Sequence, residues 1–212
     1  MVIGIIAVVI GYLLGSIPSA YIAGRVAAGK DVRQLGGGNV GGLNLYREVG
    51  ALPAAVAGIA DVCKGAAAVA IAIWLLEVDT PYVLATAVAA VVGHNWMLFL
   101  KFRGGKGMGA TIGALFVLLP FYDYAIGLAF FFGVVLIPFI ITRNVALAMG
   151  LGIVSLPFIA WLGMEKTEFL IFSLVLAFVI AVKFFPTAKD VWVRVEGLKS
   201  FIFYRGHRGE KR

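Results

Sequence analysis

A glycine- and asparagine-rich run between two long apolar segments has the composition of an anion-binding site. It reads GGGNVGGLNLYR over positions 36–47. Glycine lets the backbone adopt positive φ, so that N–H groups can converge on a small anion, and an arginine can hold a phosphate with two hydrogen bonds. A flexible loop is the alternative. For this run we predict a catalytic residue, Asn39, and substrate-binding residues, which are Gly37, Gly38, Gly41, Asn44 and Arg47.

A second glycine-rich run, RGGKGMG over positions 103–109, opens the fourth apolar segment. At a helix N-terminus, such a run combines unpaired N–H groups, the positive end of the helix dipole and a mobile ammonium. It is not a Walker A loop, because the four-residue spacing is missing and Gly107 replaces the hydroxyl residue that binds Mg²⁺. A plain positively charged flank is the alternative. We predict that Lys106 is catalytic and that four neighbours bind substrate, namely Arg103, Gly104, Gly105 and Gly107.

Three further polar residues lie inside apolar segments. Asp61 and Lys64 are three residues apart, which places them on one helix face, so they bind substrate or form an internal ion pair. His94 is a candidate for proton transfer or phosphate orientation, and an interhelical hydrogen bond is its alternative role. No second histidine or cysteine cluster accompanies His94, so we expect no metal site and no cofactor. The single cysteine, Cys63, excludes an intramolecular disulfide, and no Ser/His/Asp arrangement marks a covalent nucleophile.

The elements that must position these residues are membrane helices. The chain has 212 residues, 62% of them hydrophobic and 14% charged, whereas soluble domains are about 45–50% apolar and about 25% charged. The apolar segments run roughly 16–25 residues, enough to cross ~30 Å of hydrocarbon as helices. We predict an all-α polytopic membrane protein, a seven-helix bundle without a soluble module, whose first span is retained because no basic n-region or cleavage pattern marks a signal peptide. The predicted spans are 2–25, 51–76, 81–100, 107–122, 124–142, 145–163 and 168–186.

The basic residues predict the orientation of these spans. Lys166 alone lies on one side, together with most of the acidic residues of the loops. By the positive-inside rule, the N-terminus is outside and the C-terminus is cytoplasmic, which places both glycine-rich runs on the cytoplasmic face. The opposite, strongly basic side carries loop residues Arg25, Lys30, Arg33, Arg47, Lys101, Arg103, Lys106 and Arg143, and tail residues Lys183, Lys189, Arg194, Lys199, Arg205, Arg208, Lys211 and Arg212.

The composition changes after residue 186. Residues 187–212 mix basic and aromatic side chains, which favours a tail along the anionic inner leaflet over binding of nucleic acid. We therefore divide the chain into a transmembrane domain, 1–186, and a cytoplasmic tail, 187–212.

Taken in order, the motifs resemble those of the PlsY family, the acyl-phosphate:glycerol-3-phosphate acyltransferases of bacteria. The resemblance rests on GSIP at 15–18, DVR at 31–33, LGGGNVGGLN at 35–44 with Arg47, DVCKG at 61–65, GH at 93–94 and FRGGKG at 102–107. It implies a seven-helix membrane fold with its site at the cytoplasmic side of the plasma membrane. It also implies transfer of an acyl group from acyl phosphate to the 1-hydroxyl of sn-glycerol 3-phosphate, giving lysophosphatidic acid and phosphate, without metal or covalent intermediate.

This chain departs from the family pattern at three places. Gly37 stands where the family usually has serine, and Leu43 where it usually has threonine. After the last span the usual His-Arg-x-Asn-Ile is absent, and the chain reads KFFPTAK over 183–189. Two other functions therefore remain open: a small transporter of an anionic solute, and a catalytically silent homologue within a lipid-synthesis assembly. The acyl-chain preference, the acceptor and the oligomeric state are left open by the sequence.

The resemblance and the residues together suggest electrostatic and positional catalysis. We expect Arg47, with Lys64 or Lys106, to hold the phosphate of glycerol 3-phosphate. The backbone of 37–39 and the N–H groups of 104–107 would bind the acyl phosphate head and the developing oxyanion. The leaving phosphate takes the proton of the attacking hydroxyl, and the acyl chain lies among the helices in the bilayer.

Overall fold

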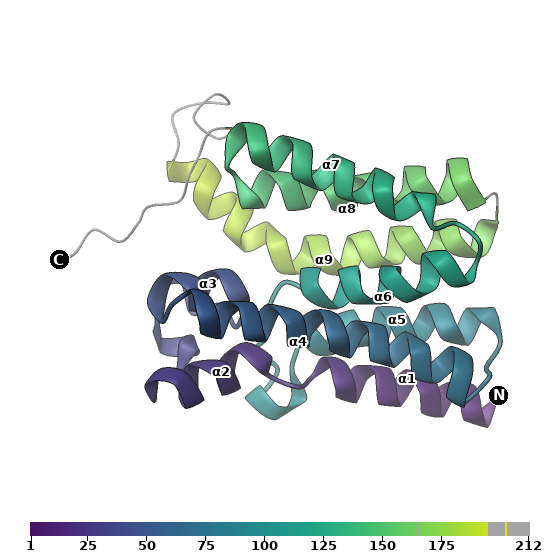
Figure 1. The fold of residues 1–212 in the computed structure, drawn as a ribbon, viewed down its shortest axis with the longest axis horizontal. Helices are drawn as coiled ribbons and strands as arrows, with labels where there is room; N and C mark the ends of the chain where they lie inside the picture. Colours follow the sequence, from purple (N-terminus) through teal and green to yellow (C-terminus); the bar gives the residue numbers. More distant parts are fainter. Residues whose placement is uncertain (165, 195–201, 203–212) are drawn as a thin grey trace. The chain divides into compact units, whose positions relative to one another are not determined.

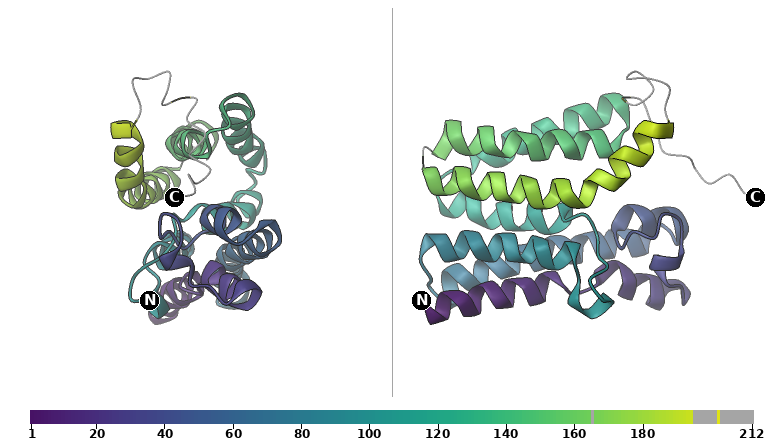
Figure 2. Two further views of the ribbon diagram at one scale, coloured as in Figure 1. Left: turned by 90° about the vertical axis from the view of Figure 1, so that its left-hand side faces the viewer. Right: turned by 180° about the vertical axis from the view of Figure 1, so that it is seen from behind.

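A computed structural model describes residues 1–164, 166–194 and 202, and the regular secondary structure in this part of the chain is helical (Figures 1 and 2). The chain divides into two compact units, Met1–Leu118 and Leu119–Arg212. All predicted site residues belong to the first unit.

The first predicted span is divided in two. Helix α1 covers Val2–Gly15 and α2 covers Ser19–Ala28, with a break at Ser16 and Ile17 before Pro18. Proline has no backbone N–H and restricts the residue before it, so the helical hydrogen-bond ladder is interrupted here. The break opens backbone carbonyls of the first helix to partners from other helices.

The remaining long helices of the first unit follow the predicted spans. Helix α4 covers Ala51–Ala70 and ends in a π-helical turn, η2, at Ile71–Leu75. Helix α5 covers Thr80–Asn95. After a short 3₁₀ turn, η3, at Leu98–Leu100, helix α6 begins at Met108 and ends at Phe121. The predicted run of glycines therefore lies directly before a helix N-terminus.

Glycines bring the helix backbones of this unit into direct contact. A Cβ atom at Gly15 would overlap the carbonyl of Ala90 on α5, and one at Gly93 would overlap the carbonyl of Tyr12 on α1. Helices α4 and α6 meet in the same way, because a Cβ at Gly65 would overlap the Ala110 carbonyl. Small residues let membrane helices approach closely enough for backbone packing. These crossings hold the ends of α1, α4, α5 and α6 in a defined arrangement.

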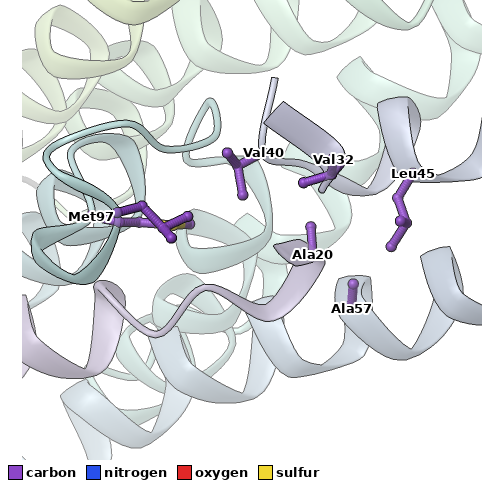
Figure 3. Close-up of a cluster of buried hydrophobic side chains, with 7 residues drawn as sticks. Ala20, Val32, Val40, Leu45, Ala57 and Met97 are labelled. Carbon is purple, nitrogen blue, oxygen red and sulfur yellow. The ribbon is translucent and has the colours of Figure 1, made fainter. Parts of the chain in front are cut away.

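The predicted glycine-rich loop is only partly a loop. Residues between the 3₁₀ turn η1 (Val32–Gln34) and position 41 are irregular, whereas Gly42–Glu48 form a short helix, α3. An apolar cluster packs beneath these segments (Figure 3). It joins α2, η1, the loop, α3, α4 and the α5–α6 connection, through the side chains of Ala20, Val32, Val40, Leu45, Ala57, Met97 and Leu100.

The second unit contains three helices in its described part. Helix α7 covers Ile126–Thr142, α8 covers Val145–Met164 and α9 covers Thr167–Arg194, with α8 packed against both neighbours. The last helix does not end at the predicted boundary, 186, but continues to Arg194, because Pro186 interrupts only the local hydrogen bonding. The rest of the predicted tail, except residue 202, lies outside the described residues, and the division at 186 stays a prediction.

The lengths of the helices agree in part with seven spans. In the described part of the chain, five segments are long and apolar enough to cross a membrane: Val2–Ala28, Ala51–Leu75, Thr80–Leu100, Val145–Gly163 and Thr167–Pro186. The two further apolar helices, α6 and α7, are shorter. The 14 residues of α6 reach about 21 Å at ~1.5 Å per residue, less than the ~30 Å hydrocarbon core. The all-α helical class is confirmed, while the count of seven spans and their orientation stay predictions.

Candidate active site

The two glycine-rich runs meet at one point. A Cβ atom at Gly105 would lie 2.8 Å from the carbonyl oxygen of Val40 and would overlap Nε2 of His94. Glycine is therefore the one residue type that fits at position 105, between the first run and the end of α5. The structure brings together two segments that are more than sixty positions apart in the sequence, with His94 against one of them.

The second run lies on the C-terminal end of α5. The Gly105 N–H donates to the His94 carbonyl at 2.9 Å, and Gly104 packs against the carbonyls of His94 and Asn95. Gly107 has a φ of 83° and packs on the Asn95 side chain, a conformation and closeness that favour glycine. These contacts fix the backbone on both sides of Lys106. They also commit the Gly105 N–H to a protein acceptor, so this amide is not a substrate donor in this structure.

Lys106 and Arg47 are basic residues of the two runs, and the charge of Arg47 acts on Lys106. Lys106 is partly buried and Arg47 is exposed. Burial lowers the pKa of the Lys106 ammonium below its usual range, and the positive charge of Arg47 lowers that pKa further. Two neighbouring cations repel each other, and an anion placed between them relieves the repulsion. The arrangement therefore suits a phosphate.

The first run is organised by Asn44 and its own backbone. The Asn44 Nδ2 lies within 3.2 Å of three carbonyl oxygens, those of Val32, Leu35 and Asn39. The Gly38 N–H donates to the Leu35 carbonyl at 2.9 Å, and Gly38 has a φ of 68°. These bonds give the Asn44 amide a supporting role, which sequence reasoning did not assign to it. Its predicted role in substrate binding stays untested.

Asn39 and Gly37 lie differently in this run. The Asn39 amide folds toward the backbone of Gly41, since a Cβ built on Gly41 would lie 2.8 Å from Asn39 Nδ2. Gly37 is exposed, and a Cβ built on it would meet no heavy atom within 4 Å. The place where the family usually has serine is therefore open, and a side chain there would not clash.

Asp61, Lys64 and His94 form a buried network. Lys64 Nζ lies 2.8 Å from Asp61 Oδ1, which confirms the possible ion pair, and donates to the Ile17 carbonyl at 2.9 Å. His94 Nδ1 lies 3.4 Å from the same carboxylate oxygen. All three side chains are buried. Asp61 and Lys64 are thus directed at protein groups, and the network ties α4 to the end of α5 and to the break between α1 and α2.

A second carboxylate organises the arginine before the first run. Arg33 donates to both oxygens of Asp31, through Nε at 3.0 Å and Nη2 at 2.7 Å, and its guanidinium lies over the Tyr21 ring. The hydrogen bond from Arg33 is the main reason why the Asp31 pKa falls from 3.8 to about 2. Arg25 also approaches Asp31, at 3.6 Å. Arg33, which flanks the motif, is therefore engaged by protein groups, whereas Arg47 and Arg103 are exposed.

Two features of the site were not predicted from the sequence. The Ile17 carbonyl is a partner of Lys64, and Pro18 is the signal that could have marked this break. Asn95 is fully buried beneath Gly107. A polar residue next to His94 in an apolar segment was the available indication of that contact.

The geometry can be compared with that of known proteins. A family model of glycerol-3-phosphate acyltransferase matches residues 5–192. The chain belongs to the glycerol-3-phosphate acyltransferase family. It is 47% identical over 178 residues to glycerol-3-phosphate acyltransferase 1 of Dehalococcoides mccartyi, covering 84% of this chain and 86% of that protein. The glycerol-3-phosphate acyltransferase of Endomicrobium trichonymphae is 37% identical over 180 residues, covering 85% of this chain and 87% of that protein.

Solved structures of the same acyltransferase family resemble the chain in fold. The crystal structure of PlsY (YgiH), an integral membrane glycerol 3-phosphate acyltransferase, in its glycerol 3-phosphate form has a TM-score of 0.79 and 27% sequence identity. The match covers 92% of this chain and 94% of that one. Its lysophosphatidic acid form has a TM-score of 0.77. The predicted family and the integral membrane, multi-pass class are confirmed.

Proposed function

We propose that this chain, a glycerol-3-phosphate acyltransferase by family, transfers an acyl group from acyl phosphate to the 1-hydroxyl of sn-glycerol 3-phosphate. The bond between the acyl carbon and the phosphate oxygen breaks, and an ester bond to the hydroxyl oxygen forms. The products are lysophosphatidic acid and phosphate. The observation that carries the proposal is the contact between the two glycine-rich runs at Gly105 and Val40, which joins the segments that carry the basic residues Lys106 and Arg47.

Arg47 and Lys106 hold the phosphate of glycerol 3-phosphate in this proposal. The charge of Arg47 acts on Lys106, so one anion can neutralise both. Lys64 was the other candidate for this role. Lys64 is bonded to Asp61 and to the Ile17 carbonyl, and we assign the role to Lys106 because it lies in the second glycine-rich run and the positive charge of Arg47 acts on it. Arg103 is exposed beside Gly104 and supplies further positive charge.

The acyl phosphate head binds at the glycine backbones and the Asn39 amide. The Gly105 N–H already donates to His94, so we assign the donor role to the amides of Gly104 and Gly107, and to Gly37 and Asn39 of the first run. Donors held in place before the reaction stabilise the oxyanion without reorganising. The contacts of the second run with α5 provide this rigidity.

The leaving phosphate accepts the proton of the attacking hydroxyl. The acyl group is transferred directly, without a covalent enzyme intermediate. His94 orients the phosphate or assists this proton through Nε2, the ring nitrogen that lies next to Gly105. Its Nδ1 lies beside Asp61, which favours a proton on that nitrogen and a lone pair on Nε2. Asp61 is thereby a positioning residue. The site lies on the cytoplasmic face of the plasma membrane, with the acyl chain in the bilayer.

Lys106→Ala and Asn39→Ala test the site. Each should lower turnover by on the order of 10²–10³, the usual cost of one lost oxyanion or phosphate donor. The assay uses purified protein with acyl phosphate and labelled glycerol 3-phosphate, and measures lysophosphatidic acid. Unchanged melting in detergent shows that each variant is folded.

Two outcomes would contradict the proposal. Turnover like that of the wild type in both variants would remove Lys106 and Asn39 from the site. Uptake of glycerol 3-phosphate into proteoliposomes without any lysophosphatidic acid would support a transporter instead.

A further inference from the structure

The connection between α5 and α6 carries a patch of large apolar side chains around Leu100, where the membrane-length segment Thr80–Leu100 ends. Leu98, Phe99 and Phe102 are 42%, 60% and 58% exposed. Lys101 and Arg103 alternate with them and are also exposed. The patch, here called the interfacial turn, covers residues 98–103.

The interfacial turn is a defined structure. Met97 and Leu100 are buried in the apolar cluster beneath the first glycine-rich run, which fastens the turn from inside. The Phe102 N–H donates to the Met97 carbonyl at 2.9 Å, and the Arg103 N–H donates to the Leu100 carbonyl at 3.2 Å. Because Met97 and Leu100 are buried and these hydrogen bonds close the turn, the remaining side chains of the turn are directed outward.

The backbone conformation of the turn indicates that its exposed side chains have a function. Lys101 and Phe102 have φ values of 54° and 61°, in the left-handed region that costs free energy for side chains other than glycine, asparagine and aspartate. Two consecutive residues in this region are held there by the bonds around them. Backbone strain of this kind persists where the surrounding structure enforces it, and it is common at ligand-binding sites.

The position of the turn suits a membrane surface. Figures 1 and 2 show the α5–α6 connection extending sideways from the first unit, away from its helices, at the level of the break between α1 and α2. The connection leaves the C-terminal end of α5, part of a membrane-length segment. At the end of a membrane span, a lateral projection is well placed to meet lipid, where phenylalanine side chains enter the acyl region and basic side chains reach phosphate groups.

We propose that the interfacial turn inserts into the lipid leaflet and binds anionic phospholipid, with Phe99 and Phe102 in the acyl region and Lys101 on the headgroup phosphates. The positive charge of the turn is complementary to anionic lipid. Since Lys101 lies three residues before Gly104, the same contact steadies the second glycine-rich run.

A depth measurement tests insertion independently of catalysis. In a Cys63→Ala background, single cysteines at Phe99 or Phe102 are labelled with an environment-sensitive fluorophore, in vesicles of phosphatidylcholine and phosphatidylglycerol in equal parts. Matched controls are Ile59, exposed on α4, and Gln34, exposed in η1. We expect probes at 99 and 102 to be quenched by lipids with a nitroxide on the acyl chain, as at 59. Quenching by aqueous iodide, as at 34, would overturn the proposal and support a soluble partner or a solvated turn.

The charge preference has its own variants. Lys101→Gln should lower the equilibrium constant for insertion of the turn about fivefold, which is the effect of one basic residue at an anionic surface. The shift should occur with phosphatidylglycerol and not with phosphatidylcholine alone, and Lys101→Arg should show none. Equal behaviour of Lys101→Gln in both lipids would overturn the assignment to anionic phospholipid.

Discussion

Gly105 and Gly37 differ in the space around their Cα atoms. A Cβ at Gly105 would overlap His94 and the Val40 carbonyl, whereas one at Gly37 would meet nothing within 4 Å. We predict that Gly105→Ala lowers stability by about 1–3 kcal/mol, the usual cost of overpacking, and largely abolishes turnover by displacing the run. Gly37→Ser should be neutral for stability, and the added hydroxyl should not reduce turnover. Melting in detergent and initial rates measure both, and a destabilised Gly37→Ser variant would contradict this view of the site.

The like charges of Arg47 and Lys106 lead to a prediction about pH. Burial and the charge of Arg47 lower the Lys106 pKa, so the protonated ammonium is lost at a lower pH than usual. Because phosphate binding requires the protonated form, kcat/KM should fall as pH rises through this lowered pKa. Arg47→Gln removes one cause of the lowering and should move the alkaline limb to higher pH, besides reducing the rate. Arg47→Lys keeps the charge and should leave the limb in place; an identical shift in both variants would exclude the electrostatic cause.

At the level of helices, the Asp61–Lys64–His94 network joins α4, α5 and the α1–α2 break. We predict that Asp61→Asn or Lys64→Met alone destabilises the protein by about 3–5 kcal/mol, because each leaves a buried charge without its partner. The double variant should be more stable than the sum of the two effects predicts, because neither charge then remains. Unfolding in mixed detergent micelles measures the cycle. Strict additivity would show that Asp61 and Lys64 do not stabilise each other as an ion pair.

The positions of the long helices could be predicted from the sequence, whereas the break in the first span and the short helix α3 could not. Apolar segments of membrane length are evident from composition, and their positions agree with the helices observed. The division of the first span at Pro18 and the short helix Gly42–Glu48 were not predicted. Proline is tolerated within membrane helices, and α3 has neither a side-chain cap nor the length to show a period, so the sequence favoured a continuous span and a loop.

The site was predictable in residue type more than in role. Glycines, arginines and Lys106 stand out because their composition suits an anion, and the runs do meet. The roles of Asn44 and Lys64 depend on carbonyl groups from distant segments, which converge only once the chain has folded. An amide or ammonium in a sequence does not reveal whether its acceptor is a ligand or the protein itself.

For the whole molecule, the basic residues predict which connections face the cytoplasm. Cysteines introduced singly at Gln34 and Lys30 should react with a membrane-impermeant thiol reagent only from the cytoplasmic side, in a Cys63→Ala background. Cysteines at Asp79 and Lys166 should react only from outside. The expectation follows from the positive-inside rule with seven spans. Reaction at position 79 from outside but at position 166 from the cytoplasmic side would show that only one of the two short helices, α6 and α7, crosses the membrane.

The glycine contacts between α1 and α5 have a consequence for membranes of different thickness. With the Gly15 backbone against Ala90 and the Gly93 backbone against Tyr12, no side chain separates the two helices at these contacts, and sliding is disfavoured. A hydrophobic mismatch must then be met by tilting of the pair as one body or by deformation of nearby lipid. The end of α5 that supports Gly104 and Gly105 keeps its distance from the α1–α2 break in either case. We therefore expect adaptation to cold or to longer acyl chains to leave the spacing between Gly104 and the α1–α2 break unchanged.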